Sequence, residues 1–131
     1  MTTLADARLV AFVSTTDFAR ARAFYVDLLG LRAVAQDDFA LTVAAGGTTI
    51  RITRVEQLTP QPFTVLGWEV TDVPGEAGRL AARGVAFERY PWFTQDERGV
   101  WTTPDGGQVA WFKDPDGNVL SISAPPPVGP G

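Results

Sequence analysis

The sequence predicts an α+β domain in which two tandem β-α-β-β-β modules form one cupped sheet of mixed and antiparallel strands. A strand followed by a capped helix occurs twice, and the two capping candidates, Asp17 and Asp72, lie 55 positions apart (72 − 17 = 55). Three short β-like runs follow each helix. A chain of 131 residues is long enough to give one such domain its own core.

The first module is expected over about residues 7–55. Apolar residues at helical spacing follow Asp17, and Gly30 stands where a helix commonly ends. The expected elements are a strand over 8–14, a helix between Asp17 and Gly30, and strands over 31–35, 39–44 and 48–53.

The second module is expected over about residues 63–123, after a polar linker that contains two prolines. Its expected elements are a strand over 64–71, a helix between Asp72 and Gly84, and strands over 85–89, 109–113 and 119–123. Two turn signals with glycine, at 105–107 and 116–118, frame the strand over 109–113. We expect one domain over 1–123 and a disordered tail, rich in proline and glycine, over 124–131.

Composition excludes several classes of function. The chain has no cysteine and no histidine, so disulfides, thiolate zinc sites and a Ser-His-Asp hydrolase are ruled out. The net charge is −4 and the basic residues are scattered, so a nucleic-acid partner is not expected. No apolar run has the length of a membrane span or a signal peptide, and we therefore expect a cytoplasmic protein.

Two segments carry a resemblance to a known family. Residues 17–31 read DFARARAFYVDLLGL, and residues 111–122 read WFKDPDGNVLSI. In this order, and with the repeated module, they resemble the vicinal oxygen chelate superfamily of glyoxalases, bleomycin-resistance proteins and extradiol dioxygenases. The resemblance implies the glyoxalase/bleomycin resistance fold and a homodimer.

The resemblance also says where a metal would be bound. Members with a metal carry one ligand on the first and one on the last strand of each module, usually His or Gln and then Glu. The matching residues here are Val10, Arg51, Val65 and Ser121. Two valines donate no electron pair and a guanidinium repels a cation, so we expect no metal and no other cofactor. A different site built from carboxylates, such as Asp37, Asp38 or Glu69, remains open.

Strand alternation assigns side chains to the cup. If Val10 and Val65 face inward, so do Phe12, Ser14 and Glu69, and the same rule places Arg51 and Ser121 there. Arg51 could orient a carboxylate or an enolate, and Glu69 an amine or a proton. Alternatively, the two charges pair with each other or lie at the rim.

Aromatic residues gather in the second module. Trp92, Phe93, Trp101 and Trp111 lie in or near the segment 90–99, which could fold over the cup as a lid. There they could stack on a planar or hydrophobic ligand, although packing in a core or a dimer would use the same residues.

Two functions follow. The first is a metal-independent protein that binds a hydrophobic or aromatic small molecule, for example to sequester an antibiotic or a metabolite. The second is a metal-free isomerase, cyclase or lyase with Glu69 and Arg51 as catalytic residues. The candidate ligand-binding residues are Phe12, Ser14, Arg51, Glu69, Trp92, Phe93, Trp101, Trp111 and Ser121.

Overall fold

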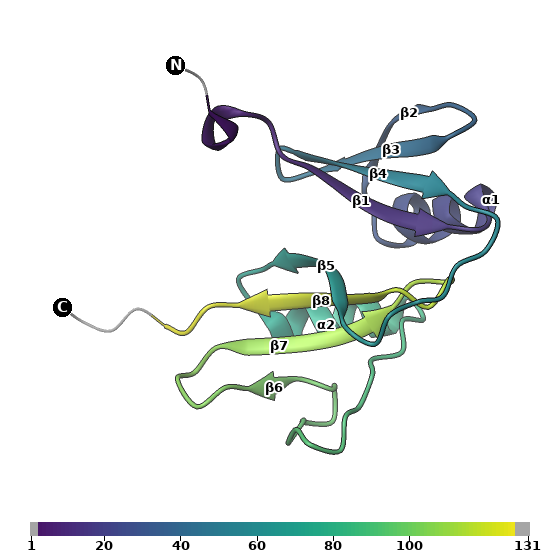
Figure 1. Ribbon diagram of the computed structural model, residues 1–131. Helices are drawn as coiled ribbons and strands as arrows, with labels where there is room; N and C mark the ends of the chain where they lie inside the picture. Colours follow the sequence, from purple (N-terminus) through teal and green to yellow (C-terminus); the bar gives the residue numbers. More distant parts are fainter. Residues whose placement is uncertain (1–2, 128–131) are drawn as a thin grey trace. The chain divides into compact units, whose positions relative to one another are not determined.

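The computed structural model describes residues 3–127. The chain divides into two compact units, Met1–Thr59 and Pro60–Gly131, and each holds a four-stranded sheet and an α-helix (Figure 1). The α+β class and the order β-α-β-β-β in each half are as predicted. No helix in the described range is long and apolar enough to cross a membrane.

The first unit contains a mixed sheet in which β1 pairs in parallel with β4, and the order across the sheet is β1-β4-β3-β2. Its elements are η1 (Leu4–Asp6), β1 (Val10–Thr15), α1 (Phe18–Arg22), η2 (Ala23–Leu28), β2 (Arg32–Gln36), β3 (Ala40–Ala45) and β4 (Thr48–Arg54). Asp17 caps α1 as predicted, because its carboxylate accepts a hydrogen bond from the Arg20 N–H at 3.1 Å. The helix widens into the π-helical turn η2, and Gly30 follows it with a φ of +81°.

One face of this sheet is buried and the other is not. Ile50 and Ile52 on β4 are buried, whereas Arg51 between them is exposed. The buried residues Phe24 and Tyr25 of η2 belong to the same core, and α1 and η2 run along that side of the sheet (Figure 1). The alternation expected from the sequence therefore sorts the two faces correctly.

The second unit repeats the arrangement, with the order β5-β8-β7-β6 and a parallel pair of β5 and β8. Its elements are β5 (Thr64–Glu69), α2 (Val73–Ala82), β6 (Trp101–Thr102), β7 (Gln108–Lys113) and β8 (Val119–Ala124). Asp72 caps α2 through the Gly75 N–H at 3.0 Å. The helix packs on β7 and β8, behind the sheet in Figure 1, so the opposite face has no helix on it.

The strand predicted over 85–89 is wrong. That segment makes one isolated bridge, between Phe87 and Phe112, and the short edge strand of the sheet is β6 instead. The reason is the side chain of Gln95, which accepts a hydrogen bond from the Tyr90 N–H and donates to the carbonyls of Glu88 and Gly99. These contacts satisfy part of the loop's backbone, and the Glu88 N–H donates to the Trp111 carbonyl of β7 at 2.8 Å.

Most other strands also begin or end a residue or two away from prediction. β1, for example, runs over Val10–Thr15 rather than 8–14. β5 ends at Glu69, before the residue expected, and β8 extends through Ala124, the first residue of the expected tail. Residues 125–127 are in neither helix nor strand, and residues 128–131 of the expected tail lie outside the described part of the chain.

Candidate functional site

The uncovered face of the first sheet carries three of the predicted site residues. Phe12 on β1 lies beside Arg51 on β4, which lies beside Thr42 on β3, so these side chains project from the same face. Ser14 is two residues along β1 and shares that face. Phe12 is 61% exposed, an unusual state for a phenylalanine.

Arg51 is a free cation within its own unit. Over residues 3–59 its guanidinium makes no hydrogen bond and no close ion pair. Its charge acts on Asp37: the pKa of that carboxyl is lowered mainly by hydrogen bonds from the Ala40 and Phe39 N–H groups, and further by Arg51. The side chain is therefore available to an anionic group on this face.

The uncovered face of the second sheet arranges four of the other predicted residues in two rows. In one row Gly67 lies beside Ser121, and Ser121 beside Trp111. In the next row Glu69 lies beside Ser123, Ser123 beside Val109, and Val109 beside Trp101. The strand register thus brings Glu69, Ser121, Trp101 and Trp111 to one surface.

Five aromatic rings meet on this surface, and we refer to them as the aromatic cluster: Tyr90, Trp92, Phe93, Trp101 and Trp111. Phe93 is central, with ring centroids 5.0 Å from Trp111 and 4.3 Å from Trp101. Tyr90 meets Trp111 edge-on at 5.4 Å and stacks on Trp92 at 5.2 Å. Trp92 is 71% exposed, so the cluster presents open aromatic surface.

A tight turn brings the loop onto the sheet. The Phe93 N–H donates to the Tyr90 carbonyl at 3.0 Å. The side chain of Gln95 accepts from the Tyr90 N–H and donates to the Gly99 carbonyl, so it connects the two ends of the segment 90–99. Burial raises the pKa of the Tyr90 phenol, and the nearby charge of Glu88 raises it further. The phenol therefore stays neutral beside the other rings.

A hollow of about 220 Å³ lies next to the aromatic cluster, and its lining is largely apolar. Its walls are Pro62, Phe63, Thr64, Tyr90, Trp92, Phe93, Trp111 and Val119. Phe63 and Tyr90 were not among the site residues predicted from the sequence. The signals that could have found them are an aromatic residue just before β5 and a second one three positions before Phe93.

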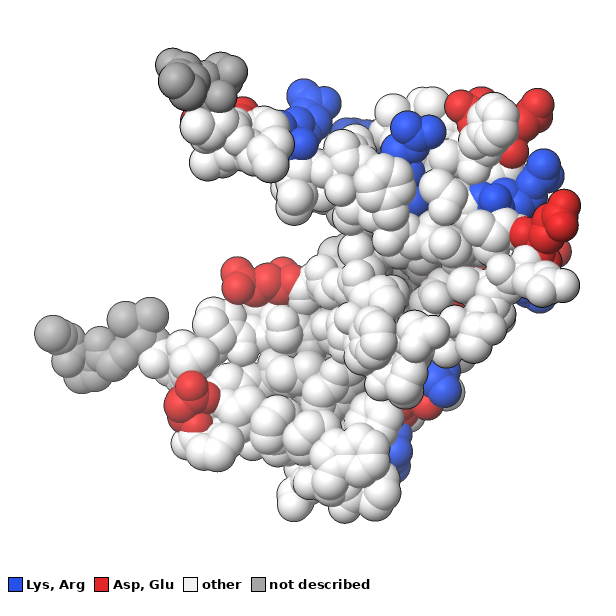
Figure 2. Space-filling model, viewed as in Figure 1, with Lys and Arg blue, Asp and Glu red and all other residues white. Residues whose placement is uncertain are grey.

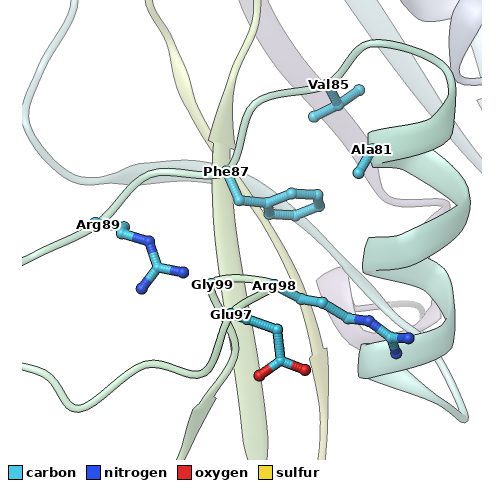
Figure 3. Close-up of a pocket in the computed structure, with 7 residues that line it drawn as sticks. All are labelled: Ala81, Val85, Phe87, Arg89, Glu97, Arg98 and Gly99. Atoms are coloured by element: carbon cyan, nitrogen blue, oxygen red, sulfur yellow. The ribbon is translucent and has the colours of Figure 1, made fainter.

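A second hollow of about 210 Å³ lies between the end of α2 and the loop at 97–99 (Figure 3). Its floor is apolar, formed by Ala81, Val85 and Phe87. The two guanidinium groups at its edge hold the loop, because Arg89 donates to the Asp96 carbonyl at 2.6 Å and Arg98 to the Pro74 carbonyl at 3.1 Å. We therefore regard the hollow beside the aromatic cluster as the stronger candidate.

Comparison with known proteins agrees with this architecture. The family model described as the Glyoxalase/Bleomycin resistance protein/Dioxygenase superfamily matches residues 8–122. The chain belongs to this superfamily. Among curated proteins, none matches the sequence.

Solved structures of the superfamily share the fold. A putative glyoxalase family protein from Bacillus anthracis superposes with a TM-score of 0.73 at 16% identity, over 95% of this chain and 98% of that one. A lactoylglutathione lyase from Agrobacterium tumefaciens has a TM-score of 0.69 at 16% identity, over 90% and 92% of the two chains. TnmS3, an antibiotic binding protein from Streptomyces sp. CB03234, has a TM-score of 0.66 at 27% identity, over 91% and 95%.

The positions at which this superfamily binds metal can now be located. Val10 and Arg51 share the uncovered face of the first sheet. Ser121 lies on the uncovered face of the second sheet, on β8. This strand pairs with β5, which carries Val65. Ser121 is 8% exposed, and its hydroxyl is a weak ligand by itself. Over residues 3–127 no three His, Cys, Asp or Glu side chains gather closely enough to hold an ion. Asp37 is one of the carboxylates considered for a different metal site, and its carboxylate accepts hydrogen bonds from the Phe39 and Ala40 N–H groups.

Proposed function

We propose that this protein binds a hydrophobic or aromatic small molecule beside the aromatic cluster, without a metal ion, and sequesters it as bleomycin-resistance proteins do. The observation that carries this proposal is the half-exposed stack of Phe93 on Trp111 at the wall of a 220 Å³ apolar hollow. A planar ligand that covers these rings removes apolar surface from water and gains ring-to-ring contacts.

The likeness to an antibiotic binding protein supports the binding function. TnmS3, an antibiotic binding protein, is 27% identical over 91% of this chain. The residues at the superfamily's metal positions support metal independence, because Val10 and Val65 have no donor atom and Arg51 is cationic.

Tryptophan fluorescence tests the proposal directly, because three of the five rings in the cluster are indoles. The wild-type protein is titrated with a panel of aromatic antibiotics and aromatic metabolites, and calorimetry measures the affinity of each compound that changes the emission. We expect at least one member to bind, and Phe93→Ala to weaken that binding about 10-fold. A panel in which nothing binds, or binding that Phe93→Ala leaves unchanged, would overturn the proposal.

A metal-free enzyme is the second candidate, and the state of two side chains favours it. Neither Arg51 nor Glu69 has a hydrogen-bonding or ion-pairing partner within its own unit of the described chain, so both can act on a ligand. Mass spectrometry of a bound compound after incubation decides between the two functions. A product that forms with the wild-type protein and not with Glu69→Gln favours the enzyme, whereas recovery of the unchanged compound from both excludes it.

We also propose that the protein forms a homodimer. Large apolar side chains are exposed on the first unit, among them Phe12, Val34 and Phe39. Light scattering of the purified protein over a range of concentrations measures the mass. A mass of one chain at every concentration would contradict the dimer.

A further inference from the structure

A lane of small side chains leads from the hollow toward Glu69. Along β8 the residues on the uncovered face are Val119, which lines the hollow, then Ser121 and Ser123. Beside Ser121 stands Gly67, which has no side chain, and a Cβ there would lie only 2.6 Å from the Ser121 Oγ. Nothing larger than a hydroxyl therefore rises from Gly67, Ser121 and Ser123, which we call the lane.

The ends of the lane differ in chemistry. Trp111 borders Ser121 on one side, and the aromatic cluster stands over that end. Glu69 lies beside Ser123 at the other end. Ser123 is four positions after Val119 on the strand, a span of about 13 Å at the usual rise of a β-strand.

The carboxylate of Glu69 is an unmatched charge. Within residues 60–127 it has no hydrogen bond and no ion pair. By contrast, Lys113, which lies beside Val119 at the hollow, is paired with Glu88 at 3.4 Å. Viewed from the side opposite α2, the surface of this unit is mostly uncharged, with charged atoms near its margins (Figure 2). A carboxylate beside such a surface attracts a cation.

From this juxtaposition we infer that the ligand is an aromatic amine: its rings enter the hollow beside the aromatic cluster, its chain lies along the lane, and its ammonium group meets Glu69. The inference rests on the proposed function and adds the ligand's charge and length. Gly67 is then a specificity-determining residue, because any side chain at this position would fill the lane.

Two fluorescent probes of the same shape test the charge. Dansylcadaverine carries a naphthalene ring, a five-carbon chain and an ammonium group, and its N-acetyl derivative lacks the charge. We expect the charged probe to bind the wild-type protein about 10-fold more tightly at low salt, and added salt to narrow the difference. Glu69→Gln should remove the preference and leave the affinity for the acetylated probe unchanged. Glu97→Gln, a change of the same charge at an exposed residue near the end of α2, is the matched control and should keep the preference.

A second pair of variants tests the lane. Gly67→Ala should weaken the binding of dansylcadaverine about 10-fold. The binding of dansylamide, which has the ring and no chain, should be nearly unchanged. Gly78→Ala in α2 is its control, because a Cβ there meets its nearest atoms at 3.9 Å, an ordinary contact. If Gly67→Ala does not fold by circular dichroism, the comparison of Glu69→Gln with Glu97→Gln decides the question alone.

The outcomes separate this inference from the proposed function. Equal affinity of the wild-type protein for the two cadaverine probes, or an unchanged preference in Glu69→Gln, overturns the inference while aromatic binding stands. If neither cadaverine probe binds, the inference also fails, and the antibiotic and metabolite panel decides separately whether the protein binds aromatic molecules at all.

Discussion

Phe93 lies face to face with Trp111, with ring centroids 5.0 Å apart and ring planes only 8° apart. The two residues come from different kinds of structure, one from a loop and the other from the sheet strand β7. Their contact is therefore what fastens the segment after α2 to the uncovered face of the sheet. It also sets one wall of the hollow.

Removing that ring should loosen the loop. We expect Phe93→Ala to lower the free energy of unfolding by about 1–2 kcal/mol, because a partly exposed ring loses both apolar contact and stacking. Gln57→Ala is the control: that side chain is exposed outside any helix or strand, and its loss should cost less than about 0.5 kcal/mol. Urea titrations followed by circular dichroism measure both values. Equal effects of the two variants would show that the stack does not stabilise the loop.

Tyr90 should make the protein sensitive to alkaline pH. Its pKa is raised above the usual value near 10, first by burial and then by Glu88, so the folded state holds the phenolic proton more strongly than the unfolded state does. The stability that Tyr90 contributes is present below pH 10 and is lost as the pH rises through the raised pKa. We expect the thermal unfolding midpoint of the wild-type protein to decrease as the pH is raised above 10, and that of Tyr90→Phe to decrease less. Absorbance at 295 nm should show a late titration step in the wild-type protein that is missing in Tyr90→Phe. An unchanged titration curve of Tyr90→Phe would contradict the assignment.

The Asp-Pro-Asp-Gly-Asn turn should depend on its first carboxylate. Asp114 is 5% exposed and accepts hydrogen bonds from the Asp116 N–H, the Asn118 N–H and the Asn118 side chain, at 2.8–3.0 Å. Replacing it with alanine leaves these donors unpaired, so we expect Asp114→Ala to cost about 2–3 kcal/mol of stability. Asp38→Ala, at an exposed aspartate, serves as the control and should be nearly neutral. Thermal unfolding of both variants provides the measurement, and a near-neutral Asp114→Ala would mean that the turn holds without its carboxylate.

Local signals predicted much of the fold because their physics is local. The carboxylates of Asp17 and Asp72 each cap a helix through an N–H three residues away, and any chain with this spacing can form the same bond. The period of two along β1 and β4 likewise predicted that Phe12 and Arg51 share a face, and the strand register confirms it.

The loop between α2 and β6 has no such period. Its shape depends on individual side-chain contacts. Gln95 bonds the backbone of three residues that no sequence pattern connects to it, and Phe93 stacks on Trp111. The wrong strand over 85–89 and the absence of Tyr90 from the predicted site have this common origin. Glu69 and Trp111 were both predicted to lie near the ligand. The strand register adds that Trp111 lies beside Ser121 and Glu69 beside Ser123, so both border the lane.

Asp37 should make stability depend on acidic pH. The N–H groups of Ala40 and Phe39 donate to its carboxylate at 2.9 and 2.8 Å, and they hold its pKa below the usual 3.8. A lowered pKa in the folded state adds stability that is present above pH 3.8 and is lost as the pH falls through the folded value. We expect the midpoint of thermal unfolding of the wild-type protein to drop more steeply below pH 4 than that of Asp37→Asn. Asp38→Asn should follow the wild-type curve, and coincident curves for all three proteins would contradict the role of Asp37.

Chelation should leave the protein unchanged. The residues at the superfamily's metal positions include Val10, Val65 and the cation Arg51, so no divalent ion should stabilise the fold. We expect samples with and without EDTA to unfold at the same temperature and to bind the same aromatic probe with equal affinity. Nickel, zinc or magnesium added in excess should shift the unfolding temperature by less than about 1 °C, because an ion that does not bind the native state adds no stability. Elemental analysis of protein purified without a metal-affinity step provides an independent measurement. One equivalent of any of these metals that survives dialysis, or a probe affinity that EDTA abolishes, would show that the ligand site is built around an ion after all.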